Sequence, residues 1–237
     1  QQPSWLENEK RRSDVRLLLM GAVLNNNASG QDGDPMETAL FNMAREAGLI
    51  PEQVRLQSPR KGEIPFDSRR KLMTTVNEIE GHDIVFVKGA VDVLLKKCTR
   101  LANPAAGQKA GTAGPGAGAA IPSRTLSSSD RQRILDQNSR WSARGLRVLA
   151  FACRPFNEEG KEHGNSGLAG AKAGNSQERS SLSGRLEDNL VFLGLTAMMD
   201  PPRPESRQAV ASARQAGIRP VMITGDHKAV SYTHLRA

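Results

Sequence analysis

Val221-Met-Ile-Thr-Gly-Asp-His227 is the stretch that decides the fold class of the carboxyl-terminal part of this chain. Its apolar start predicts a β-strand over 218–223. Two earlier patterns, an apolar run at 190–197 and a helical stripe at 204–216, predict a strand and a helix in front of it. A strand, a helix and a second strand in this order indicate a parallel sheet, whose ligands bind at the carboxyl ends of the strands.

Thr224, Gly225 and Asp226 stand at the carboxyl end of that predicted strand. A carboxylate and a hydroxyl suit Mg²⁺ and phosphoryl oxygens, because this ion prefers hard oxygen ligands, and a glycine lets backbone N–H groups approach. Asp200-Pro-Pro-Arg203 opens the preceding helix. Together these residues predict phosphoryl-transfer chemistry. The structural alternative for Asp226 is a turn residue that caps the next helix.

The composition argues against a nucleic-acid-binding surface and against a membrane-spanning helix. The chain has 237 residues, enough for one large domain or two modest ones, and a net charge of +8. Aromatic residues make up only 4%, too few for a surface that stacks nucleic-acid bases, and the basic residues are scattered. The longest apolar stretches are about half of the ~20 residues that a membrane helix needs, and we expect no signal peptide. Cys98 and Cys153 are predicted to be buried thiols.

The first 187 residues show patterns of helices and antiparallel strands. These patterns predict a helical segment at 11–24, a helix at 35–47, a hairpin at 72–79 and 84–88, a helix at 91–98, a helix at 130–143 and a strand at 146–153. Two stretches rich in Gly, Ala, Ser and Asn, 102–122 and 157–185, predict flexible insertions. We expect a domain boundary near residue 188.

Five motifs, in this order, resemble the cytoplasmic ATP-binding region of P-type cation-transporting ATPases, most closely the calcium-pump branch. They are Asp34-Pro-Met-Glu-Thr-Ala-Leu40, Ile64-Pro-Phe-Asp-Ser-Arg-Arg-Lys-Leu-Met73, Val87-Lys-Gly-Ala90, Gly145-Leu-Arg-Val-Leu-Ala150, and Asp200-Pro-Pro-Arg203 with Thr224-Gly-Asp226. The resemblance runs from about residue 12 to His227, apart from the two insertions.

The resemblance implies two domains. Residues 1–187 would form an α+β nucleotide-binding domain, an antiparallel sheet flanked by helices. Residues 188–229 would form part of a Rossmann-like phosphorylation domain of the haloacid-dehalogenase type. The pattern stops after His227, and we expect residues 230–237 to be a non-native tail.

The family's phosphorylated aspartate sits in an Asp-Lys-Thr-Gly-Thr motif that does not occur in this sequence. The resemblance therefore implies a fragment of a pump, on the cytoplasmic side of a membrane. Its partners would be the actuator domain, the rest of the phosphorylation domain and the transmembrane helices. The implied cofactors are ATP and Mg²⁺, and the implied cargo is a cation, which the resemblance to the calcium-pump branch suggests is Ca²⁺. We expect the fragment alone to bind ATP weakly and to turn over none.

The resemblance also implies individual roles near the adenine. Phe66 would stack on the ring, and Lys71 would lie in the adenine and phosphate pocket. Lys88, next to the permissive backbone of Gly89, would lie deep in that pocket. The structural alternatives are a core aromatic at a strand edge for Phe66, a solvated surface side chain for Lys71, and a solubilising charge at a strand end for Lys88.

Four further residues have implied roles near the nucleotide. Glu37 would touch the adenine edge or hold neighbouring side chains; alternatively, it completes a capping box with Asp34. Arg147 would clamp a phosphate, a task that suits a bidentate guanidinium, rather than point outward from a strand. Asp200 and Arg203 would touch the nucleotide and link the domains, or serve only as a stiff hinge with a helix cap.

Thr224, Gly225 and Asp226 are the implied catalytic residues, beside the reacting phosphoryl group. No set of residues is predicted to hold a metal ion by itself. Two other functions stay open from the sequence. One is a soluble phosphohydrolase of the haloacid-dehalogenase type, and the other is a basic nucleic-acid-binding module.

Overall fold

The computed structural model describes residues 12–28, 33–103, 121–156, 186–199 and 204–221. Its strands are β1 (Arg60–Asp67), β2 (Leu72–Ile79), β3 (His82–Gly89), β4 (Cys98–Ala102), β5 (Ser123–Thr125), β6 (Arg147–Pro155) and β7 (Leu190–Met198). Its helices are α1 (Arg12–Leu24), α2 (Pro35–Glu46), α3 (Pro51–Gln57), α4 (Val91–Lys97), α5 (Ser128–Ala143) and α7 (Pro204–Gln215).

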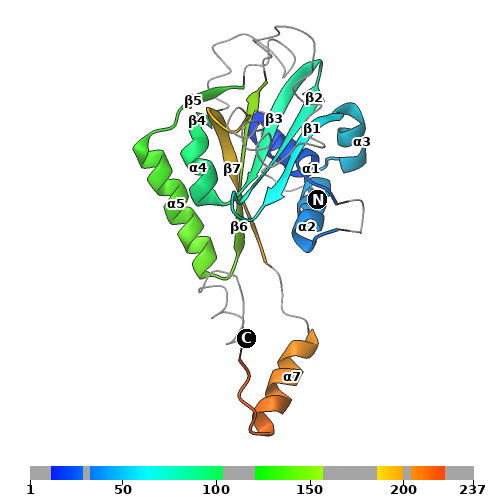
Figure 1. The fold of residues 1–237 in the computed structure, drawn as a ribbon, viewed down its shortest axis with the longest axis vertical. Coiled ribbons are helices and arrows are strands. Elements are labelled where there is room, and N and C mark those ends of the chain that lie inside the picture. Colours follow the sequence, from blue (N-terminus) through cyan, green and yellow to red (C-terminus); the bar gives the residue numbers. More distant parts are fainter. Residues whose placement is uncertain (1–11, 29–32, 104–120, 157–185, 200–203, 222–237) are drawn as a thin grey trace.

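The strands form one seven-stranded sheet in the order β1-β2-β3-β6-β7-β4-β5, flanked by helices (Figure 1). The expected α+β arrangement of a sheet with flanking helices is confirmed. The sheet is mixed rather than purely antiparallel, because β4 and β7 run parallel while the other neighbours are antiparallel. A parallel pair needs a long connection, which the chain between the two strands provides.

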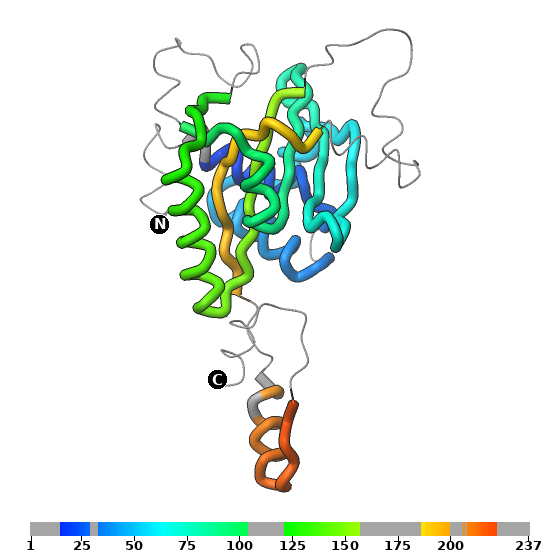
Figure 2. Tube along the Cα trace, turned by 60° about the vertical axis from the view of Figure 1, so that its left-hand side comes forward, coloured from blue at the N-terminus to red at the C-terminus, as the bar shows by residue number. Residues whose placement is uncertain are grey.

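Alternation along β3 divides the core into two layers. Val85 and Val87 belong to the cluster with α4 and α5, whereas Phe86 belongs to the cluster with α1 and α2. Figures 1 and 2 show these helices on opposite sides of the sheet. The helix α1 packs so closely that a Cβ on Gly21 would lie 3.0 Å from the Phe86 ring. Both faces are therefore covered, and polar side chains can reach solvent mainly at the edges of the sheet.

The strand predicted at 190–197 exists, but it does not open a second sheet. It is β7, which lies between β6 and β4 in the interior of the same sheet. The expectation of a new parallel sheet beginning there is therefore wrong. An interior strand is buried on both faces and carries a continuous apolar run whether its neighbours are parallel or antiparallel, so the sequence pattern did not distinguish the two cases.

The helix predicted at 204–216 is found as α7. Of the strand predicted at 218–223, the structure describes residues 218–221, and these form no strand. A strand needs a neighbour to pair its backbone groups, and no second sheet occurs among the residues that the structure describes. The haloacid-dehalogenase-type domain thus stays a prediction.

Candidate functional site

Five of the residues singled out in the sequence lie at one edge of the sheet. The chain direction alternates between β1, β2 and β3, so the end of β1, the start of β2 and the end of β3 meet there, next to the start of β6 (Figure 1). Phe66 lies near the end of β1, Lys71 precedes β2, Lys88 and Gly89 end β3, and Arg147 begins β6. We call this the loaded edge.

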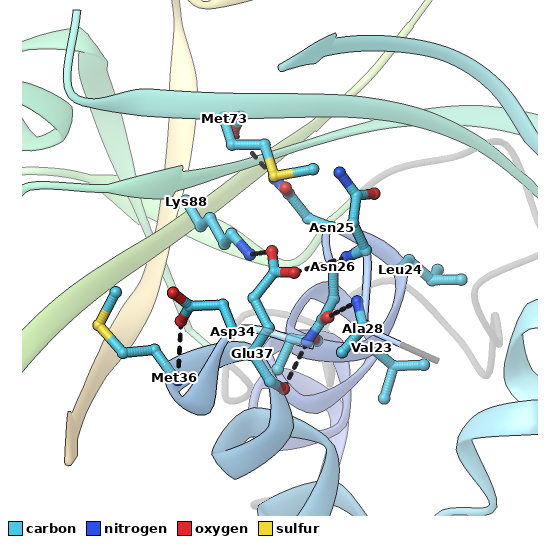
Figure 3. Close-up of polar contacts among 12 residues, drawn as sticks. Val23, Leu24, Asn25, Asn26, Ala28, Asp34, Met36, Glu37, Met73 and Lys88 are labelled. Atoms are coloured by element: carbon cyan, nitrogen blue, oxygen red, sulfur yellow. Dashed lines mark hydrogen bonds and ion pairs between the residues drawn. The ribbon is translucent and has the colours of Figure 1, made fainter. Parts of the chain in front are cut away.

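Lys88 is buried and ion-paired. It is only 7% exposed, and its Nζ lies 2.7 Å from Glu37 Oε1 at the start of α2 (Figure 3). Burial lowers the pKa of Lys88, because desolvation penalises the charged form, and the hydrogen bond that Lys88 donates to Glu37 opposes this shift. The alternative of a solubilising charge at a strand end is therefore wrong. A buried ammonium needs a charge partner, and the Glu37 carboxylate provides it.

Glu37 does not complete a capping box. The N-terminus of α2 is capped by Asp34, whose Oδ1 accepts from the backbone N–H of Met36 at 2.8 Å. The second carboxylate oxygen of Glu37 accepts instead from the backbone N–H of Asn27 at 3.1 Å. The capping-box interpretation is thus wrong for this residue, because the pull of the Lys88 ammonium directs its side chain towards the sheet (Figure 3).

Asn25 and Asn26 form a platform that the sequence analysis missed. Both are fully buried, at the end of α1. The Asn25 amide donates to the carbonyls of Met73 and Phe86, at 2.9 Å each, and so joins β2 to β3. The Asn26 amide donates to the backbone carbonyl of Glu37 at 2.8 Å. The signal available in the sequence was the run of three asparagines after an apolar helix. Amides at such a place, when they are buried, form hydrogen bonds to the elements around them.

Phe66 is presented to solvent by a bulge. Ile64 pairs with Thr74 and Asp67 pairs with Leu72, so Pro65 and Phe66 together oppose a single residue of β2. The Phe66 side chain is 61% exposed. The alternative of a core aromatic is therefore wrong, and a large ring is left accessible on β1, two strands away from Lys88 on β3.

Gly89 allows the turn before β2 to lie against the end of β3. A Cβ at this position would lie 2.1 Å from the backbone oxygen of Lys71. That oxygen accepts from the backbone N–H of Ala90 at 3.1 Å, and the N–H of Lys71 donates to Asp67 at 2.6 Å. Lys71 adopts a left-handed φ of 56° and its side chain is exposed. A close backbone approach is the physical reason for glycine here.

Arg147 shares a face of the sheet with Lys88. Lys88 pairs with Phe151, and Arg147 lies four residues before Phe151 on β6, roughly 13 Å along the strand. It is partly buried. Its predicted alternation with Val148 is confirmed, because Val148 packs against the core cluster of α4 and α5, on the other face of the sheet. Arg147 thus lies on the loaded edge, but at a distance from the ion pair of Lys88 and Glu37.

The structure does not place every predicted residue. Asp200, Arg203, Thr224, Gly225 and Asp226 lie outside the described residues. Within the described ranges, no group of three or more His, Cys, Asp or Glu side chains is arranged to hold a metal ion. No helix among those ranges is both long and apolar enough to cross a membrane.

The loaded edge combines an accessible aromatic ring with cations and one carboxylate. The ring is that of Phe66, the cations belong to Lys71, Lys88 and Arg147, and the carboxylate belongs to Glu37. A ring of this kind stacks on a planar base, and cations of this kind bind a polyanion. The arrangement is suited to a nucleotide.

Comparison with known proteins defines the class. Residues 13–205 match the family described as P-type ATPase, cytoplasmic domain N. The chain therefore belongs to the P-type ATPase family.

The chain is also similar to individual members of this family. The chain is 34% identical, over 92% of its length, to Calcium-transporting ATPase 1 of Lactococcus lactis subsp. lactis. It is 34% identical over 96% of its length to Calcium-transporting ATPase 1 of Bacillus cereus, and 35% identical over 90% to the Calcium-transporting ATPase of Bacillus subtilis. It spans only 21% to 22% of the length of these relatives.

Proposed function

We propose that this chain is the ATP-binding part of a P-type pump that couples ATP hydrolysis, through an aspartyl phosphate, to cation transport across a membrane. The observation that supports it best is the buried Lys88, paired with Glu37 on the same sheet edge as the exposed ring of Phe66. A basic protein surface alone does not explain a lysine held in a desolvated position.

Different residues of the loaded edge bind the two ends of ATP. Phe66 stacks on adenine, a contact that contributes about 1–3 kcal/mol. Lys71, Lys88 and Arg147 neutralise the phosphates, and Gly89 lets the backbone of the pocket close around the ligand. Glu37 neutralises the ammonium of Lys88 until a phosphate approaches. The same carboxylate can also accept a hydrogen bond from the amino group of adenine.

The remaining predicted residues act in the adjoining domain. We assign residues from Asp200 onward to the phosphorylation domain, because β7 ends at Met198 and the sheet with it. Asp200 and Arg203 form the link. Thr224, Gly225 and Asp226 would lie beside the transferred phosphoryl group, and the Asp226 carboxylate would help to hold a Mg²⁺ ion that neutralises its charge. Transfer of this kind depends mainly on positioning and on charge neutralisation.

The whole pump supplies what this chain lacks in sequence. The accepting aspartate, the actuator domain and the membrane helices are the proposed partners, and the chain sits on the cytoplasmic side of the membrane. Calcium is the proposed ion, by analogy with relatives that are named calcium-transporting ATPases. The chain by itself binds ATP and forms no phosphoenzyme, because it contains no Asp-Lys-Thr-Gly-Thr motif.

Calorimetric titration of the 237-residue chain with MgATP tests this function. Phe66→Ala and Lys88→Ala should each weaken binding by about tenfold, given the contribution of one stacking or charged contact. Lys61→Ala is the matched control, because Lys61 pairs with Glu78 and Asp83 at the opposite edge of the sheet. Undiminished affinity in both folded variants would overturn the proposal.

A competition experiment separates this function from a nucleic-acid-binding module. At fixed salt, ATP should displace a fluorescent ATP analogue far better than an oligonucleotide of equal phosphate concentration. Oligonucleotide binding would instead weaken steeply with salt, with a slope set by the phosphates neutralised. The soluble phosphohydrolase predicts release of inorganic phosphate from small phosphomonoesters, and we expect none.

A further inference from the structure

We propose that Arg70 is a positioning residue for the ring of Phe66 that stacks on adenine, and not a nucleotide ligand. It would act by tying the bulge that presents Phe66 to Glu187, a buried carboxylate 117 residues further along the chain. This inference rests on the proposed function. It concerns the one basic residue between Phe66 and Lys71 whose guanidinium is engaged with a buried partner in the structure.

Glu187 requires a cation at this place. Its side chain is 0% exposed, and it lies just before β7, on the opposite side of the sheet from the ion pair of Lys88. It accepts from the hydroxyl of Thr74 at 2.5 Å and is ion-paired with the Nη1 of Arg70. A buried carboxylate is strongly unfavourable without a charge partner, so Arg70 is held where it is.

The second nitrogen of the same guanidinium holds the backbone of the bulge. Arg70 Nη2 donates to the carbonyl of Pro65 at 2.8 Å, and Pro65 precedes Phe66. A planar guanidinium joins two acceptors in a fixed geometry, which a lysine ammonium does not reproduce. The buried carboxylate therefore fixes the direction in which the chain leaves Pro65, and with it the position of the exposed ring.

The turn between β1 and β2 is ordered by a further set of contacts. Asp67 Oδ1 accepts from the backbone N–H groups of Arg69 and Arg70, at 2.8 and 2.9 Å. These donors lower the pKa of Asp67, so it stays charged at neutral pH. The contacts of Asp67 therefore hold the turn without the Arg70 side chain. What the Arg70 side chain adds is the link from the carbonyl of Pro65 to the carboxylate of Glu187.

A double-mutant cycle on the full 237-residue chain tests this role. MgATP and inorganic tripolyphosphate are titrated into the wild type, Arg70→Ala, Phe66→Ala and the double variant. Arg70→Ala should weaken MgATP binding by about fivefold, within the range of couplings between residues in one network, and leave tripolyphosphate binding unchanged. In the Phe66→Ala background, the same substitution should cause no further loss of MgATP affinity.

Arg70→Lys is a second variant, used in case the Arg70→Ala protein does not fold. It keeps a cation beside Glu187 but joins the two acceptors less well, so it should fold and show the same selective loss, in smaller degree. Arg45→Ala is the control, because Arg45 forms an exposed ion pair with Glu52, away from the loaded edge.

The outcomes separate three cases. Loss of tripolyphosphate affinity together with MgATP affinity would make Arg70 a phosphate ligand and overturn the inference. Additive losses in the double variant, or full MgATP affinity in a folded Arg70→Lys protein, would overturn it as well. If Phe66→Ala leaves MgATP binding unchanged, Phe66 does not stack on adenine and this inference fails. The proposed function fails as well only if the folded Lys88→Ala protein also binds MgATP with undiminished affinity.

Discussion

The ammonium of Lys88 and the carboxylate of Glu37 lie 2.7 Å apart, although 51 residues separate them in the chain. The pair joins the end of a central strand to the first turn of a helix that covers the sheet. Only 9% of the Lys88 side chain and 18% of the Glu37 side chain are exposed. Breaking a pair of this kind by removing one partner costs about 3–5 kcal/mol, because it leaves an uncompensated buried charge.

The first prediction concerns the pH dependence of stability. Burial lowers the pKa of Lys88 below the ordinary value of 10.5, so the unfolded chain binds more protons than the folded one between the lowered value and 10.5. Stability contributed by this group is therefore lowest below its folded pKa and rises with pH through that window. Glu37→Gln removes an interaction that raises this pKa, so the rise should begin at a lower pH.

Urea unfolding between pH 7 and pH 10 measures this effect. Lys88→Met is the matched control, because it lacks the titrating group while every other lysine remains. The difference in unfolding free energy between wild type and Lys88→Met should change with pH, and the change should extend to lower pH in the Glu37→Gln background. A difference that is flat across the range in both backgrounds contradicts the prediction.

The second prediction concerns the asparagine platform. Asn25→Ala removes two buried hydrogen bonds, to Met73 and Phe86, and leaves their carbonyls without this donor. We expect a loss of about 2 kcal/mol in the unfolding free energy, since a buried group left unsatisfied costs about 1–3 kcal/mol. Denaturant unfolding curves at pH 7 give this number.

Asn42→Ala is the control for that substitution, because Asn42 is exposed on α2. It should leave stability unchanged or raise it slightly, since alanine is the better helix former. Equal effects of the two substitutions would show that the platform contributes nothing beyond the helix itself.

Much of the sheet could be predicted from the sequence where local signals were strong. The helix that starts after Asp34 and the hairpin around Gly81 follow from a cap, a proline and alternating apolar residues, and both are found. The short strands β4 and β5 could not be predicted, because they are stabilised by pairing with distant segments rather than by local patterns.

The sequence predicted which residues belong to the candidate site, but not how they are arranged. Phe66 and Lys88 were identified through motifs, yet neither the exposure of the ring nor the burial of the lysine could be read from them. Burial depends on what packs against the strand end, here the first turn of α2, which carries Glu37. Asn25 and Glu187 were missed, because a buried polar residue is recognised only once its partners, far away in sequence, are known.

The third prediction concerns acid stability. The ion pair with Arg124 and the contacts from Ser127 hold the pKa of Asp130 well below its usual range. A lowered folded pKa means that this stabilisation is complete above the unfolded value of about 3.9 and is lost as pH falls towards the folded value. Asp130→Asn should therefore lower stability at pH 7 and reduce its fall between pH 5 and pH 2.

Urea midpoints of wild type and Asp130→Asn over that range provide the test. Asp136→Asn, on an exposed position of the same helix, is the control and should leave the acid dependence close to that of the wild type. Parallel curves for wild type and Asp130→Asn would show that the capping carboxylate does not contribute to acid stability.

The fourth prediction links packing directly to ligand binding. Gly89→Ala places a methyl group 2.1 Å from the backbone oxygen of Lys71, so the turn before β2 must move away from the end of β3. Overpacking of this kind costs about 1–3 kcal/mol in stability. Because the displaced turn also carries the chain from Phe66 to Lys71, MgATP binding should weaken by at least about fivefold, as a coupling of roughly 1 kcal/mol implies.

Gly81→Ala distinguishes loss of stability from loss of the site. Gly81 has a φ of 79° in the hairpin turn at the opposite edge, and nothing lies within 4 Å of an added Cβ. Its substitution should cost about 1 kcal/mol through the left-handed backbone alone. Calorimetry should then show full MgATP affinity for Gly81→Ala and reduced affinity for Gly89→Ala at comparable stability. If both variants bind equally well, the contact between Gly89 and Lys71 maintains the fold without shaping the pocket.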